Sequence, residues 1–158
     1  MFHLVLFQPE IPANTGNIIR LCANTGARLH LIHPLGFLMD DRRLRRAGLD
    51  YHEYAEVAEH DTFEAFVASV KPRRLFGLST HGRRSLFEAA FEPGDAFLLG
   101  PETRGLPSDL RTALGENLLR LPMKPHSRSL NLANTAAVVI YEAWRQRDFA
   151  AGESRRDE

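Results

Sequence analysis

The chain has 158 residues, of which 44% are hydrophobic, and its 20 basic and 20 acidic residues give a formal net charge of zero. This length predicts one globular domain with a substantial core, and the charge balance excludes a simple polycation. The lone cysteine, Cys22, excludes an internal disulfide and a zinc site built from cysteines, and its apolar surroundings predict a small buried side chain.

The basic residues are 18 Arg and only 2 Lys. Arginine suits phosphate because its planar group binds two oxygens at once, although genomic base composition would explain the bias as simply. Residues 2–7 are apolar but lack the length and basic flank of a signal peptide, and no apolar run approaches membrane-spanning length. We therefore expect a cytoplasmic protein.

The chain begins with a strand–helix–strand pattern, which predicts parallel pairing of the two strands. The expected elements are a strand at 2–7, a helix capped by Asn14 or Thr15 that runs to about Asn24 and stops at Gly26, and a strand at 29–32.

The same alternation continues to the end of the chain. Helices are expected at 40–47, at 61–70 with Asp61 as cap, from a Ser108 cap to Gly115, and at 130–147, and strands at 74–79, 96–100 and 118–121. The pattern predicts an α/β fold, a mostly parallel sheet with helices on both faces. We expect one domain over 1–149 and a frayed tail over 150–158.

The last helix is apolar nearly all round, whereas a surface helix needs only one apolar stripe. A helix central to the monomer is one explanation. In so small a domain, we favour a helix that packs on the sheet with one face and on a second copy of the chain with another, giving a homodimer.

Three polar loops follow predicted strands, so they should meet at the carboxyl edge of the sheet. The first, at 8–17, places amides and backbone N–H groups at a helix start, a natural anion site with Arg20 nearby. Taken alone, this loop is better explained as a capped helix with a surface arginine. The second, at 100–107, contains Glu102, which has no evident structural duty. The third, at 121–134, leads into the last helix through Asn131 and Asn134. No phosphate-binding glycine motif and no metal-ligand spacing is present, so the residues alone leave the reaction open.

The three loops together resemble the signature motifs of the SPOUT (SpoU/TrmH-type) RNA 2′-O-methyltransferases. The motifs read NTGNIIR at 14–20, LGPETRGL at 99–106, and LPM at 121–123 followed by SRSLNLAN at 127–134. Ala133 departs from the serine that the family often has. The runs RRLRRAGLDYH at 42–52 and YEAWRQ at 141–146 are similar to those of the single-domain tRNA (cytidine/uridine-34) enzymes.

The resemblance implies an α/β fold with a C-terminal deep trefoil knot, a homodimer, and transfer of a methyl group from S-adenosylmethionine to the ribose 2′-hydroxyl of the wobble nucleotide of tRNA, without a metal. It implies S-adenosylhomocysteine as product and the tRNA anticodon stem-loop as partner. The implied cofactor-binding residues are Leu78, Gly100, Leu121, Met123, Ser129 and Leu130, and the implied catalytic residues are Arg20, Asn14, Glu102 and Asn131.

An arginine cluster is the expected RNA contact: Arg42, Arg43, Arg45 and Arg46, with Arg128 in the third loop. A solvated charged helix is the alternative explanation. Two other functions stay open, namely 2′-O-methylation of rRNA or of another tRNA position, and a non-catalytic RNA-binding factor.

Overall fold

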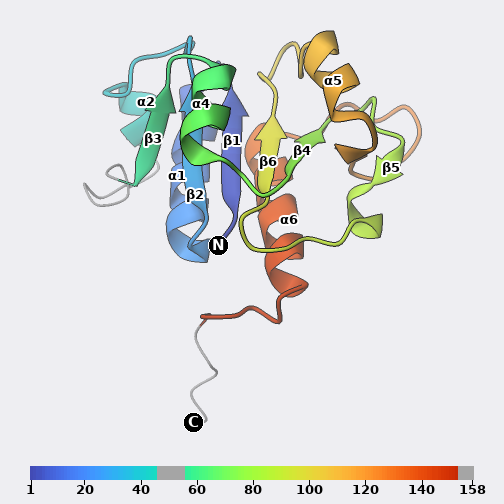
Figure 1. The fold of residues 1–158 in the computed structure, drawn as a ribbon. Helices are drawn as coiled ribbons and strands as arrows, with labels where there is room; N and C mark the ends of the chain where they lie inside the picture. The colour runs from blue at the N-terminus through green and yellow to red at the C-terminus, as the bar shows by residue number, and fades with distance from the viewer. Residues whose placement is uncertain (46–55, 153–158) are drawn as a thin grey trace.

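The computed structural model describes residues 1–45 and 56–152. Within these ranges one sheet of seven strands runs in the order β3-β2-β1-β6-β4-β7-β5, and every neighbouring pair is parallel (Figure 1). The strands are β1 (His3–Phe7), β2 (Arg28–Ile32), β3 (Val57–His60), β4 (Leu75–Leu78), β5 (Arg84–Ser85), β6 (Ala96–Leu99) and β7 (Leu118–Arg120). The predicted parallel α/β architecture is confirmed. Strands β3 and β5 were not predicted, because both are short and polar.

Helices cover both faces of the sheet. They are α1 (Pro12–Thr25), α2 (Arg42–Arg45), α4 (Phe63–Val70), α5 (Ser108–Leu114) and α6 (Leu132–Arg145), with 3-10 turns η1 (Leu86–Glu88) and η2 (Gly115–Asn117). Helices α1 and α6 pack in the larger core on one face, and α4 and α5 pack in the smaller core on the other.

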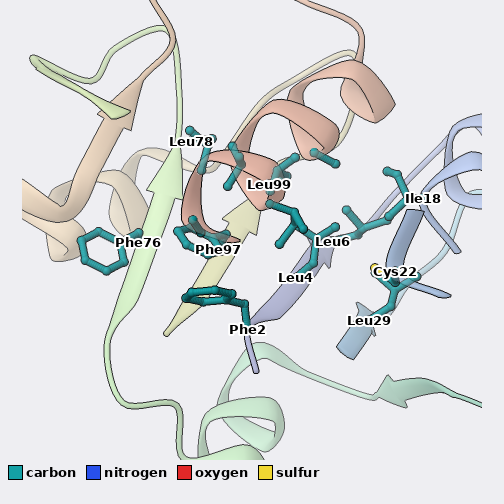
Figure 2. Packing of buried hydrophobic residues seen from close by; sticks show 14 of the residues in the cluster. Phe2, Leu4, Leu6, Ile18, Cys22, Leu29, Phe76, Leu78, Phe97 and Leu99 are labelled. Atoms are coloured by element: carbon teal, nitrogen blue, oxygen red, sulfur yellow. The ribbon is translucent and has the colours of Figure 1, made fainter. Parts of the chain in front are cut away.

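Side chains in the central strands alternate between these two cores, as the two-residue period of a strand requires. In β1, Leu4 and Leu6 enter the larger core and Val5 enters the smaller one. Figure 2 shows the larger core, in which these leucines face Ile18 and Cys22 of α1. Burial raises the pKa of the Cys22 thiol to about 12, so this residue is the small buried side chain that was predicted.

Several predicted helix starts were wrong by one to four residues. Helix α1 begins at Pro12, ahead of both predicted caps, because proline is pre-set for the first helical position. The cap of α4 is Thr62, not Asp61, and its hydroxyl accepts from the backbone N–H of Ala65 at 3.0 Å. Ser108 is the first residue of α5 and is preceded by Pro107. The predicted stop of α1 is confirmed, since Gly26 adopts a left-handed φ of 74°.

A chain of three histidines crosses strands β1, β2 and β3. His30 Nε2 lies 3.0 Å from His3 Nδ1, and His30 Nδ1 lies 3.0 Å from His60 Nε2. His30 is only 5% exposed, and burial, with smaller contributions from His3, His60 and Arg28, lowers its pKa to about 3. No local sequence pattern indicates these contacts, because the bonded histidines are 27 and 30 residues apart.

Helix α6 begins at Leu132 after its cap Asn131, slightly later than predicted. Its sheet-facing side is buried, whereas Val138 and Tyr141 on other sides are 36% and 45% exposed. After the helix the chain turns back, and Trp144 Nε1 donates to the carbonyl of Ala150 at 3.0 Å. Of the predicted tail at 150–158, residues 150–152 belong to the described ranges and 153–158 lie outside them. No helix in the described ranges is long and apolar enough to cross a membrane.

Candidate active site

A cleft of about 460 Å³ lies at the carboxyl edge of the sheet, where the three polar loops were expected to meet. Its walls come from the segments that follow β4, β6 and β7 and from the start of α1. All six predicted cofactor-binding residues line it: Leu78, Gly100, Leu121, Met123, Ser129 and Leu130. In the described part of the chain, no cluster of His, Cys, Asp or Glu is arranged to hold a metal ion.

Gly100 is required by the close approach of its own loop. A Cβ atom at this position would overlap the backbone of Gly105 and Leu106, so no larger residue fits without moving the loop. The glycine of the second motif thus lets residues 100–106 fold back tightly and form one wall of the cleft.

Glu102 joins the second loop to the first. Its carboxylate accepts from the backbone N–H of Glu10 at 2.7 Å and of Ile11 at 3.1 Å, and from Asn14 Nδ2 at 3.4 Å. The predicted anion site at the start of α1 is therefore filled by a carboxylate of the protein itself, which a helix N-terminus favours. This is the structural duty that the sequence did not reveal.

Asn131 extends this network to the third loop. Its Nδ2 donates to Asn14 Oδ1 at 3.1 Å, while its Oδ1 caps α6 by accepting from the backbone N–H groups of Ala133 and Asn134 at 2.9 and 3.3 Å. Glu102, Asn14 and Asn131 thus form one hydrogen-bonded network that joins all three motif loops, which we call the loop brace. Because these side chains already bind one another, the geometry favours a positioning role for them.

A second tie between the first two loops was missed from sequence. Glu10 Oε1 accepts from the backbone N–H of Thr103 at 3.1 Å and from its hydroxyl at 2.8 Å. These two bonds lower the pKa of the Glu10 carboxyl. Glutamate and threonine are common on any protein surface, so the sequence does not indicate that Glu10 and Thr103 bind each other. Only their proximity in the structure shows this contact.

The structure places the predicted arginines away from the cleft wall. Arg20 is half-buried on α1, Arg128 is exposed in the third loop, and neither is among the residues that line the cleft. On α2, Arg42 and Arg45 are exposed while Leu44 is buried, so the helix presents its charges outward. Arg46 lies outside the described residues.

Arg43 differs from its neighbours because Asp41 holds it. Arg43 Nε and Nη2 donate to the two Asp41 oxygens at 3.2 and 3.0 Å, and this hydrogen-bonded pair raises the pKa of Arg43. A phosphate would have to compete with this carboxylate for the guanidinium, which makes Arg43 the weakest of the described RNA-contact candidates on α2.

The parallel sheet and the cleft built from three motif loops define an α/β methyltransferase of the SPOUT class. The chain belongs to the SpoU rRNA methylase family, whose sequence profile matches residues 1–141.

Similar proteins span almost the same length. A tRNA (cytidine(34)-2′-O)-methyltransferase of Methylovorus glucosotrophus is 60% identical over 95% of this chain and 98% of its own, and the Escherichia coli protein of that name is 56% identical over 92% and 94%. A solved structure described as explaining 2-OH methylation of C/U34 on tRNA has a TM-score of 0.87 and 48% identity, over 94% and 97% of the chains. The SpoU methyltransferase AviRb of Streptomyces viridochromogenes, solved with AdoMet, has a TM-score of 0.79 and 27% identity, over 96% of this chain and 58% of its own.

Proposed function

We propose that this protein transfers a methyl group from S-adenosylmethionine to the ribose 2′-hydroxyl of nucleotide 34, the wobble position of tRNA. The observation that carries the proposal is the loop brace, which holds three motif loops around one cleft. Relatives with 56–60% identity over more than nine-tenths of the chain carry this activity in their names.

The cleft fits the cofactor in size and chemistry. Its volume falls within the range of small-molecule sites, about 300–1,000 Å³. Leu78, Leu121 and Met123 offer an apolar slot for adenine, and the Ser129 hydroxyl offers a polar contact. Within the described segment 122–130, one backbone hydrogen bond forms, from the Ser127 N–H to the Lys124 carbonyl, so other backbone groups of this segment are available to a ligand.

The bound cofactor supplies an activated methyl group on a sulfonium. The protein's task would be to hold the ribose 2′-oxygen in line with that methyl group, with S-adenosylhomocysteine as the leaving group and the hydroxyl proton passing to solvent. Rigid alignment can lower the barrier by about 7–11 kcal/mol, and the loop brace provides that rigidity. Arginine is a poor general base, because its delocalised guanidinium does not give up its proton in proteins. We assign Arg20 to RNA phosphate and to the alkoxide charge that develops.

A homodimer is part of the proposal. Val138, Tyr141 and Leu130 form exposed apolar surface on and next to α6, and Leu130 also lines the cleft. A second copy packed there would cover this surface and lie beside the active site.

A trefoil knot is also proposed, on the strand order around β7. This strand lies between β4 and β5, which precede it in the chain, so the 79–83 connection must pass across it. That connection lies close to β7: Ser79 N–H donates to the Leu119 carbonyl at 3.0 Å, and a Cβ on Gly82 would lie 2.6 Å from the Leu119 carbonyl carbon.

For the RNA partner, we expect the anticodon stem-loop to contact the exposed arginines of α2 and Arg128. An enzyme of tRNA would act in the cytoplasm.

The test is methylation of unmodified tRNA transcripts by the purified protein with S-adenosylmethionine, followed by mass spectrometry of nuclease fragments. A single 2′-O-methyl group at nucleotide 34 is expected, and an Arg20→Ala variant should lose it. Methylation of another tRNA position, or of ribosomal RNA in a parallel reaction, would overturn the assignment.

A further inference from the structure

Arg111 is a cleft residue that lies outside all three motifs. It sits on α5, which packs next to β4, and it contributes to the wall of the cleft. Its Nε atom is fully buried and has no hydrogen-bond partner, and no ion pair involves its guanidinium in the described part of the chain.

The cleft itself offers this cation no evident counter-charge. Glu102 is the acidic residue that lines the cleft, and its carboxylate already accepts from Glu10, Ile11 and Asn14. A buried donor on a charged group that lacks an acceptor lowers stability, so a cation held at this cost in the wall of a ligand site points to a ligand group of opposite charge.

The ligand group must be an oxyanion small enough to reach a recessed position. A guanidinium binds carboxylate and phosphate oxygens well because its N–H groups form a planar fork. A tRNA phosphate lies on a bulky polymer and would meet the exposed arginines first. The α-carboxylate of the cofactor enters the cleft with the rest of that molecule.

We propose that Arg111 binds the α-carboxylate of S-adenosylmethionine. This inference rests on the proposed function and adds to it a cofactor contact made by a helix outside the motif loops.

The test is a two-by-two cycle measured by calorimetry without RNA. S-adenosylmethionine and its decarboxylated analogue, which differ by the carboxylate alone, are titrated into the wild-type protein and into Arg111→Gln. Wild type should bind the analogue about 10- to 100-fold more weakly, the usual loss for one charged hydrogen-bonded contact, and Arg111→Gln should bind both ligands with the weaker affinity.

Arg83→Gln is the matched control, since Arg83 is exposed and does not line the cleft. It should discriminate between the two ligands as wild type does. Arg111→Lys keeps the positive charge and should restore part of the preference for S-adenosylmethionine over its analogue. A folding defect would not produce such a partial recovery.

Wild-type protein that binds both ligands equally would overturn the inference, as would an Arg111→Gln variant that still prefers the carboxylate. A variant that binds the cofactor normally but loses affinity for tRNA would assign Arg111 to phosphate and also overturn it. Wild-type protein that binds neither ligand would overturn the proposed function itself, a result distinct from these.

Discussion

Glu102→Gln tests whether the loop brace holds the active site together. The substitution keeps the shape of the side chain but replaces a carboxylate that accepts three hydrogen bonds, two of them at 2.7 and 3.1 Å from backbone N–H groups. The glutamine oxygen can replace either Oε1, which accepts from Ile11 and Asn14, or Oε2, which accepts from Glu10, and the NH₂ group then faces the remaining N–H. Each hydrogen bond to a charged group contributes about 1.5–3 kcal/mol, and the site is partly open to water, so we expect the unfolding free energy to fall by about 2–3 kcal/mol.

Urea unfolding followed by circular dichroism measures this change, and turnover of tRNA measures its consequence. The slope of the unfolding free energy against urea should stay constant, while kcat should fall as the three loops lose their common alignment. Glu116→Gln is the control, because Glu116 is exposed and should change stability by less than about 0.5 kcal/mol. If Glu102→Gln behaves like this control, the brace does not stabilise the site.

Three further predictions follow from the described contacts. Because the pKa of His30 is about 3 when folded and 6.5 ordinarily, the unfolded chain binds the extra proton between these values. The contribution of His30 to the unfolding free energy is therefore fully present above pH ~6.5 and is lost as the pH falls, by up to about 1.4 kcal/mol per pH unit. His30→Phe should reduce the difference in unfolding free energy between pH 7 and pH 5, measured by urea titration. Gly82→Ala places a Cβ 2.6 Å from the backbone of β7, so thermal unfolding should show a loss of about 1–3 kcal/mol, and an unchanged midpoint would contradict that packing. Replacing Arg42 and Arg45 together with Ala should weaken tRNA binding and lower the salt-dependence slope by about 2, which is about 1 for each arginine. Arg43→Ala, whose guanidinium is held by an aspartate, should lower the slope by clearly less than about 1, and a change of about 1 would refute this ranking.

Local chemistry determined a large part of the fold. The apolar runs of β1, β4, β6 and β7 and the helical periodicity between them predicted the parallel sheet, and Gly26 marked the end of α1. These features depend on neighbours within a few residues, so a sequence contains them directly. The prediction of the helix cap was wrong where two adjacent residues were equally suitable, as with Asp61 and Thr62. The backbone path of the folded chain selects between such residues.

The features of the active site also fall into those that could be predicted from the sequence and those that required the folded structure. The alternation of strands and polar loops predicted which loops would meet at the cleft, and the resemblance of the three motifs to the SPOUT family implied the six residues that line it. Only the tertiary structure showed that Glu102 binds backbone groups 91 and 92 residues away, that three histidines join across three strands, and that Arg111 faces the cleft. The physical reason is that each of these depends on the distance between atoms remote in the chain, which the order of strands in the sheet decides and which no local pattern contains.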